Sequence, residues 1–406
     1  MQKRKLTIWT SHSEVDTFRK CPAKWGYRYP EGLRPPISSV HLRLGSAYHR
    51  GLDAGWTQVR KLQQEGETEW REMTRSGITS DSIMAMGAAL TEQETKARER
   101  AQAAGIPFDL DEDPDEMFDL LRSMISIYWR LAWDLVGKYD VELVEEKFEM
   151  SVAYGVKFRG VIDLLLRCRL TGDLVVVEHK TTTSAPMDIE DRFGFDPQAN
   201  AYLYAVQQMI KKGKLKPGAV GRVQYHVARK KIPSSPTVKK DGMVSTAAID
   251  TLAEVYAEAL AKQVPSTERQ QKAAAAYDEK PTDRNLERLE KANNAYAETR
   301  ADQERILGQL HGRGLGAFVG SYECSFSEGQ VQLWREEMSA VAKRLRAAHK
   351  GIRDRNPGHC TAPGSGECEY RPICVEDPKY QNQVKTTRFV KREPRKENDA
   401  QANTNS

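Results

Sequence analysis

The sequence predicts an α/β protein, because segments with the periodicity of strands alternate with segments that have the periodicity of helices. The strand signal is concentrated in residues 141–180, where β-branched and aromatic residues are bounded by turns at Tyr154-Gly155 and Thr171-Gly172. It returns in residues 220–229. With 406 residues, 39% of them hydrophobic, the chain can bury one large core or two ordinary ones.

Capping residues mark where helices are expected to begin. Ser11 followed by Glu14 predicts a short helix that ends at Cys21-Pro22, and Asp196 before Pro197 opens another. The aromatic, basic and Pro-rich stretch over residues 21–36 is expected to be an extended connection.

A longer helix is expected over residues 44–63. Gly45, His49, Leu52 and Trp56 recur on one of its faces at helical spacing, so that this face turns toward the core. Further amphipathic helices are expected over residues 115–138 and 327–349.

Charge and hydropathy exclude few classes of function. The formal net charge of +5 is compatible with a polyanionic partner such as DNA. We expect a cytoplasmic protein without a membrane segment, because no apolar run reaches spanning length and the basic N-terminus lacks an apolar signal-peptide core.

The apolar strand LVVVEHK (residues 174–180) ends in charged residues that a protein interior normally rejects. If Thr171-Gly172 is a two-residue hairpin loop, Asp163 lies opposite Lys180 and Leu165 lies opposite Glu178. Asp163, Glu178 and Lys180 then share one face of the hairpin. Two carboxylates can hold Mg²⁺ or Mn²⁺, and the lysine can position or deprotonate a water beside them. A structural ion pair at a strand end is the alternative for this motif.

Three further polar residues accompany this set. Gln198 and Tyr202 share one face in the first two turns of the helix after Asp196, where the helix dipole favours an anion. His49 lies on the inward stripe of its helix, where a satisfied core histidine is the alternative to a ligand.

Four short motifs resemble those of RecB-type nucleases in the PD-(D/E)XK superfamily. They are GSAYH (residues 45–49), GVID (160–163), VVVEHKT (175–181) and QANAY (198–202), in the order that the family has. The resemblance implies a restriction-endonuclease-like core, in which helices flank a mixed central sheet, with helical insertions. It covers roughly residues 8–56, 115–235 and 315–378.

The resemblance also assigns roles to residues. It implies that His49, Asp163 and Glu178 contact Mg²⁺ or Mn²⁺, with the backbone carbonyl of His179 as a further ligand. Lys180 would be the catalytic lysine.

The same resemblance implies that Gln198 and Tyr202 orient the nucleic-acid backbone or the groups of the active site. Many relatives have Asp where this chain has Glu178, and the motif of the superfamily allows either.

Three of the six cysteines, Cys360, Cys368 and Cys374, fall within 15 residues near the C-terminus. A cluster of thiols in a cytosolic chain indicates Zn²⁺ or an iron–sulfur centre rather than disulfides, and Cys21 is the obvious fourth ligand. This arrangement resembles the [4Fe–4S] staple of some RecB-type nucleases, such as the AddB nuclease domain and CRISPR-associated RecB-like exonucleases. A Zn²⁺ site is the alternative.

We therefore divide the chain into six regions. They are N-terminal helices with the first cluster cysteine and the His motif (1–56), a helical insertion (57–114), the nuclease core (115–235), a helical hairpin insertion (236–314), the C-terminal strand, helix and cysteines (315–378), and a disordered basic and polar tail (379–406).

Basic and aromatic residues mark an expected path for DNA with single-stranded ends, where phosphates are neutralised and bases stack. They are Lys24, Trp25, Tyr27, Arg28, Arg229 and Lys230. Packing of the aromatics around the cysteine cluster is the alternative.

The sequence thus favours a metal-dependent exonuclease that hydrolyses DNA at ends, in recombination, repair or phage DNA processing. No GxxxxGK[ST] motif is present, so a helicase or recombinase partner is implied if the enzyme is processive. The alternative is a non-catalytic DNA-binding or assembly module that retains the fold and the cluster. RNA as the substrate is also compatible with these residues.

Overall fold

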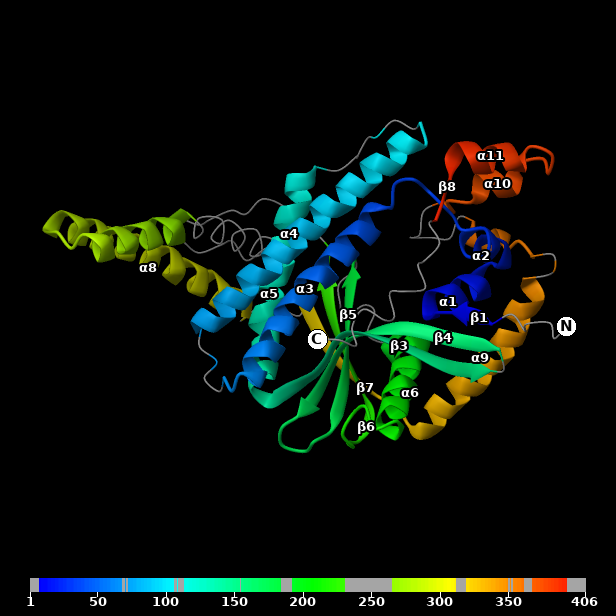
Figure 1. Cartoon of the computed structure of the whole chain (residues 1–406), viewed down its shortest axis with the longest axis horizontal. Coiled ribbons are helices and arrows are strands. Elements are labelled where there is room, and N and C mark those ends of the chain that lie inside the picture. Colours follow the sequence, from blue (N-terminus) through cyan, green and yellow to red (C-terminus); the bar gives the residue numbers. More distant parts are fainter. Residues whose placement is uncertain are drawn as a thin grey trace.

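The computed structural model describes residues 7–67, 70, 72–105, 108, 113–153, 155–183, 192–230, 265–311, 319–349, 351, 353–360 and 367–392 (Figure 1). A six-stranded sheet lies at the centre, in the order β1-β4-β5-β6-β7, with β3 also paired to β4. The strands are β1 (Ile8–Thr10), β3 (Tyr139–Ala153), β4 (Val156–Cys168), β5 (Leu174–Thr182), β6 (Val220–Arg229) and β7 (Val319–Ser325). The β1–β4 and β5–β6 pairs are parallel and the others are antiparallel, which confirms the expected mixed sheet.

Helices cover both faces of the sheet (Figure 1). One layer consists of α3 (Val40–Gln64), α4 (Glu72–Ala103) and α5 (Pro114–Lys138). It buries Leu164, Leu166 and Val177 of the sheet in one hydrophobic cluster. The other layer consists of α1 (His12–Lys20), α6 (Pro197–Lys211) and α9 (Glu328–Ala348), and it buries Leu165 and Val176 in a second cluster. Neighbouring residues of a strand thus enter opposite cores, as pleating requires.

The predicted caps account for how several helices begin. The Ser11 side chain accepts a hydrogen bond from the backbone N–H of Glu14 at the start of α1, and Asp196 caps α6 before Pro197. Ser327 and Gln330 form a full capping box on α9.

The register expected for the β4–β5 hairpin is wrong by two residues. Leu165 lies opposite Val176, and Leu164 lies opposite Val177. The reason is a wider turn, in which Cys168 rather than Leu170 faces Asp173. A shift of two residues preserves the face of every side chain, so the predicted convergence of polar groups survives the error.

Described segments from near the two ends of the chain lie side by side (Figure 1). Here β2 (Leu33–Arg34) pairs with β8 (Val390–Lys391), beside α2 (Pro22–Arg28), a 3-10 turn (Pro357–His359), α10 (Arg371–Val375) and α11 (Gln381–Arg388). Leu33, Tyr370, Ile373 and Phe389 form a small separate core between these segments.

Two expectations for these ends are corrected. Residues 21–36 are not wholly extended, because Cys21 caps a helix that Pro22 begins and that buries Trp25. The tail expected to be disordered is ordered through α11 and β8, because Phe389 is buried and Lys385 forms an ion pair with Glu31. Residues 393–406 lie outside the described residues.

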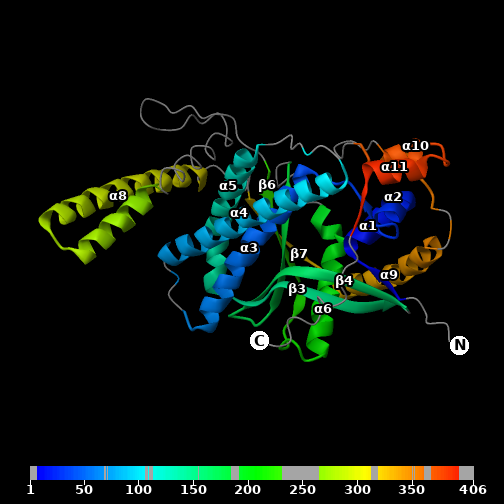
Figure 2. The same cartoon turned by 45° about the horizontal axis from the view of Figure 1, so that its top comes forward.

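A pair of antiparallel helices, formed by residues 265–279 and by α8 (Asp283–His311), extends away from the sheet (Figures 1 and 2). Gln270 on the first helix donates a hydrogen bond to Asn293 on the second. Residues 236–264 and 312–314 of the expected helical insertion lie outside the described residues. Among the helices that the structure describes, none is both long and apolar enough to cross a membrane.

Candidate active site

The sheet divides where β4 and β5 separate. One edge of β4 pairs with β3, and its other edge pairs with β1 at residues 156–158 and with β5 at residues 164–167. The β4–β5 ladder ends at Leu164 and Val177, whereas β5 continues beside β6 as far as Thr182. Asp163 and Glu178 are the first residues past the last pair on their strands. We call this point the fork.

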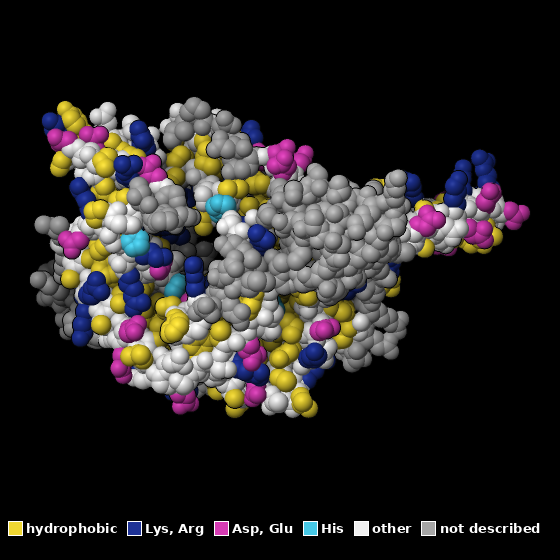
Figure 3. All heavy atoms as spheres, turned by 180° about the vertical axis from the view of Figure 1, so that it is seen from behind, with side chains coloured by type: hydrophobic (Ala, Val, Ile, Leu, Met, Phe, Trp, Pro, Cys, Tyr) yellow, Lys and Arg dark blue, Asp and Glu magenta, His cyan; other side chains and the backbone are white. Residues whose placement is uncertain are grey.

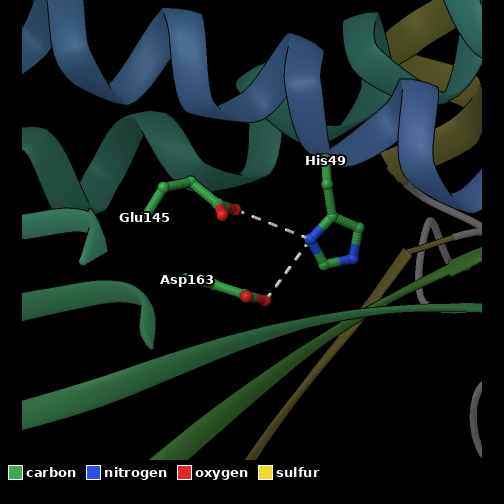
Figure 4. Close-up of side chains that lie close together, drawn as sticks. All are labelled: His49, Glu145 and Asp163. Atoms are coloured by element: carbon green, nitrogen blue, oxygen red, sulfur yellow. Dashed lines mark ion pairs between the residues drawn. The ribbon is translucent and has the colours of Figure 1, made fainter. Parts of the chain in front are cut away.

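Three potential ligands meet on the α3 side of the fork (Figure 4). The Nδ1 atom of His49 lies 3.5 Å from Oδ2 of Asp163 and 3.9 Å from Oε1 of Glu145. One ligand atom from each residue lies within 4.8 Å of the other two. An imidazole with carboxylate oxygens is a donor set that a divalent cation such as Mn²⁺ accepts.

Glu178 and Lys180 are joined to α6 by hydrogen bonds. The Lys180 ammonium donates to Oε1 of Glu178 at 2.6 Å and to Oε1 of Gln198 at 2.7 Å. The Gln198 amide donates to Oε1 of Glu178 at 2.9 Å and also to the Tyr202 hydroxyl. Gln198 therefore fixes both the acid and the lysine of the predicted motif.

The second oxygen of Glu178 tests whether the residues fit a cation. Oε2 is buried and has no hydrogen-bond partner in the part of the chain that the structure describes. A buried carboxylate oxygen without a partner is costly, and an oxygen-binding cation would satisfy it. The residues at the fork therefore fit a hard divalent cation.

The electrostatics of Asp163 agree with this fit. Burial raises the pKa of Asp163 to about 8, and the nearby negative charge of Glu178 adds to the effect. Two carboxylates this close repel each other unless positive charge lies between or beside them.

The cationic side chains at the fork respond to the same field. Burial lowers the pKa of His49, but a hydrogen bond with Glu145 and the charges of Asp163 and Glu178 outweigh burial and raise it to about 9. Burial likewise opposes the charge of Lys180, but Glu178 and Asp196 raise its pKa above the ordinary value. The fork is therefore a strongly negative site.

His179 contributes its backbone to the fork. Its N–H donates to Oδ2 of Asp163 at 2.9 Å, while the ring is buried on the α5 side against Tyr128. The role of its carbonyl as a metal ligand stays a prediction.

A family model described as the PD-(D/E)XK nuclease superfamily matches residues 10–375. The chain belongs to this superfamily. Membership implies a nuclease that uses a divalent metal, and the His49, Glu145 and Asp163 side chains form a group that can hold one. No curated protein matches the chain.

Glu145 is the residue of this PD-(D/E)XK site that the sequence analysis missed. Ala153 pairs with Val156 where β3 meets β4, and continuing that register would place Glu146 opposite Asp163. A register shift between Ser151 and Ala153 moves the ladder by one residue and places Glu145 there instead. Glu145 has a positive φ of 46°.

Four cysteines line one cavity of about 290 Å³ at the junction of the chain ends. They are Cys21, Cys360, Cys368 and Cys374, the four predicted cluster ligands. Basic side chains of Lys24, Arg355 and Arg371 line the same cavity. The backbone N–H of Cys368 donates to the carbonyl of Cys360 at 2.9 Å, which closes the loop between these two cysteines.

The prediction that Trp25 stacks on DNA bases is wrong. Its side chain is fully buried, and its Nε1 donates to Oε1 of Glu14 at 3.0 Å. Trp25 also packs edge-on against Phe18, so it belongs to the core near the cysteines.

The other basic and aromatic candidates are only partly buried, and their DNA-binding role stays a prediction. Lys24 and Arg28 both lie beside Glu369, at 3.8 and 3.2 Å, and Tyr27 stacks on Tyr370. Of the second group, Arg229 donates to the carbonyl of Thr183 and Lys230 donates to the carbonyl of His41.

Proposed function

We propose that this chain is a Mg²⁺- or Mn²⁺-dependent exodeoxyribonuclease of the RecB-like type, which hydrolyses phosphodiester bonds at DNA ends. The observation that carries the proposal is the convergence of Asp163, Glu178 and Lys180 with His49 at the fork. A structural ion pair at a strand end would not explain why Oε2 of Glu178 is buried near a second carboxylate with no hydrogen-bond partner among the described residues.

In this proposal Asp163, Glu178 and His49 hold the cation, together with Glu145 and the carbonyl of His179. A bound divalent cation supplies Lewis-acid polarisation of the scissile phosphate and lowers the pKa of water. Asp163 is kept in place by the backbone N–H of His179.

Lys180 is proposed to orient the attacking water and to stabilise the charge that develops on the phosphate. Its ammonium is already directed by Glu178 and Gln198, so its position does not depend on the substrate. Tyr202 supports Gln198 from the next turn of α6.

The preference for DNA ends comes from the RecB-type resemblance. Lys and Arg side chains gather beside a hollow in the face drawn in Figure 3, with His side chains among them, which suits a polyanionic substrate. We place the activity in recombination, repair or phage DNA processing, with a helicase or recombinase as the partner that would drive unwinding.

We also propose that Cys21, Cys360, Cys368 and Cys374 bind a [4Fe–4S] cluster rather than Zn²⁺. The four thiols line one cavity of about 290 Å³, which has room for a cluster of several atoms. The cluster would join the two ends of the chain around a nuclease core that we assign to residues 115–235.

The experiment that tests the function uses anaerobically purified protein and end-labelled DNA. Linear single-stranded, linear double-stranded and covalently closed circular DNA are incubated with Mg²⁺, with Mn²⁺ or with a chelator. We expect metal-dependent release of nucleotides from linear DNA and none from closed circles. Asp163→Ala should remove the activity.

Each other outcome has a definite meaning. Cleavage of closed circles would contradict the proposed exonuclease activity and indicate an endonuclease. No cleavage by the wild type, or equal cleavage by Asp163→Ala, would favour the non-catalytic DNA-binding module instead. Cleavage of RNA in preference to DNA would contradict DNA as the substrate and favour RNA.

A further inference from the structure

A buried polar cluster lies directly behind the fork, on the α5 side of the sheet. At its centre the Tyr128 hydroxyl contacts three groups: Nε1 of Trp56 at 2.7 Å, Nε2 of His179 at 2.9 Å and Nδ1 of His226 at 3.3 Å. All four side chains are at most 4% exposed. The proposed function gives no role to Tyr128, Trp56 or His226.

The number of available protons restricts how these hydrogen bonds run. The indole N–H of Trp56 can only donate, and a tyrosine hydroxyl has one proton to donate. Both histidine rings are buried, and burial disfavours the charged form of an imidazole, so each ring is neutral and carries one N–H. Tyr128 must therefore donate to one histidine and accept from the other.

The carboxylate of Asp163 decides between the two arrangements. Nδ1 of His179 lies 3.8 Å from Oδ2 of Asp163. If Tyr128 donates to Nε2 of His179, the proton of that ring is on Nδ1 and faces the carboxylate. With a divalent cation bound, Asp163 is ionised, so in the reverse arrangement a bare nitrogen lone pair would face a carboxylate, which is repulsive. The first arrangement is therefore favoured.

We propose that Tyr128 is a positioning residue of the active site, whose hydroxyl holds His179 as the Nδ1–H tautomer and so directs an N–H toward Asp163. Oδ2 of Asp163 then faces two N–H groups of the same residue, the backbone amide at 2.9 Å and the ring. Asp163 is thereby held in place beside His49, whose Nδ1 lies 3.5 Å from the same oxygen. Groups that orient metal-ligating side chains typically affect metal affinity or activity by about 10–100-fold.

The tautomer can be read directly by NMR on protein labelled with ¹⁵N in histidine. The signals of His179 are identified as those that disappear in His179→Gln. In the wild type with Mg²⁺ bound we expect the proton on Nδ1 and a bare Nε2. In Tyr128→Phe we expect a shift toward the Nε2–H form, because the donor to Nε2 is gone and free neutral histidine prefers that form.

Tyr48→Phe is the matched control. The Tyr48 hydroxyl is also buried, on the neighbouring helix, but it has no hydrogen-bond partner within the described residues. Its ring packs edge-on against Tyr128. Tyr48→Phe therefore removes the same atom from the same core but leaves the hydrogen bonds of the Tyr128 hydroxyl intact. It should leave the His179 tautomer unchanged.

The second measurement is Mn²⁺ affinity by electron paramagnetic resonance. We expect Tyr128→Phe to weaken Mn²⁺ binding by about tenfold and Tyr48→Phe to leave it unchanged. This inference rests on the proposed function only in taking Asp163 as a metal ligand. Because neither readout needs catalysis, absence of cleavage would defeat the proposed function without deciding this inference.

Three results would overturn the inference. The first is a His179 in the Mg²⁺-bound wild type that carries its proton on Nε2, which is detected without Tyr128→Phe. The second is an unchanged tautomer in Tyr128→Phe. The third is an equal loss of Mn²⁺ affinity in Tyr128→Phe and Tyr48→Phe, which would indicate a general packing effect.

Discussion

Three carboxylates lie at the fork, those of Glu145, Asp163 and Glu178, and they differ in how far they are removed from water. The side chains of Asp163 and Glu178 are 9% and 5% exposed, whereas that of Glu145 is 34% exposed. A buried carboxylate has fewer waters to replace a lost cation. Asp163 and Glu178 should therefore dominate metal binding, with Glu145 as a weaker contributor.

Glu145→Gln tests this order. We expect the Mn²⁺ concentration for half-maximal cleavage to rise by about tenfold, with a smaller loss of activity than Asp163→Asn causes, because water can replace an exposed ligand. The measurement is the cleavage rate of linear DNA as a function of Mn²⁺. Glu146→Gln, one residue along the strand and exposed, is the control and should match the wild type. Equal effects at positions 145 and 146 would exclude a specific role for Glu145.

Glu14 gives a pH-dependent test at a residue outside the fork. It is 6% exposed, and burial raises its pKa from 4.5 to about 7 although the hydrogen bond from Trp25 opposes the shift. Between those pH values the folded protein retains a proton that the unfolded chain has lost. The contribution of Glu14 to the free energy of unfolding therefore falls as pH rises from about 4.5 to 7, and it levels off above that range.

Glu14→Gln should remove this fall, because glutamine does not titrate and can still accept from Trp25. The free energy of unfolding of the variant, relative to that of the wild type, should increase by up to about 3 kcal/mol between pH 4.5 and pH 8. Urea denaturation of both proteins at the two pH values measures the gain. A difference between the proteins that does not change with pH would contradict the role assigned to Glu14.

At the scale of elements, α3 must approach α4 and α5 closely for His49 to reach the fork. Gly51 and Gly55 on α3 make this approach possible. A Cβ at Gly51 would lie 2.6 Å from Cδ1 of Ile125 and 2.9 Å from the backbone oxygen of Ser82. These glycines are thus spacers between helices.

Gly51→Ala should destabilise the protein by about 1–3 kcal/mol, because the added methyl group overpacks the contact with α4 and α5. Gly77→Ala on α4 is the control, since nothing lies within 4 Å of its added Cβ. It should stabilise the helix by about 0.5–1 kcal/mol, the usual gain of alanine over glycine. Thermal unfolding of both variants checks the opposite signs, and a stabilised Gly51→Ala would show that the helices are not closely packed there.

Most of what could be predicted about these elements depends on interactions between residues that are close in the sequence. Caps such as Ser11 and Asp196 act within a few residues, and they were found where the sequence indicated. The predicted register of β4 against β5 was wrong, because the register depends on the width of one turn. Glu145 was missed because a register shift elsewhere in the same strand decides which acid faces Asp163. The burial of Trp25 depends on Glu14 and Phe18 and is not encoded locally.

At the scale of the whole molecule, segments from near both ends of the chain pack together. Cys21 lies in the same cavity as Cys360, Cys368 and Cys374, and Leu33 is paired with Lys391. No local pattern indicates that β2 and β8 pair, so the ordered segment after residue 379 could not be predicted. The gathering of the four cysteines could be predicted, because thiolates are soft ligands that favour a shared metal centre.

Cys374→Ala should lose most of the proposed cluster and lower the free energy of unfolding by about 2–5 kcal/mol, the usual effect of losing a native cross-link. Iron content, visible absorbance and thermal unfolding of anaerobic protein measure both effects. Cys324→Ala is the control, because Cys324 lies on β7 and does not line the cavity. Full iron content in a stable Cys374→Ala protein would contradict the staple.

The central claim is that Asp163 and Glu178 act as one metal-dependent centre for DNA cleavage. The most direct measurement is the rate at which linear DNA is cleaved in Mg²⁺ by the wild type, Asp163→Asn, Glu178→Gln and the double variant. Because members of one catalytic unit are not additive, each single variant should lose at least about 10³-fold in rate and the double variant should lose no more. Wild-type-like cleavage by either single variant, or independent and multiplying losses, would contradict the account.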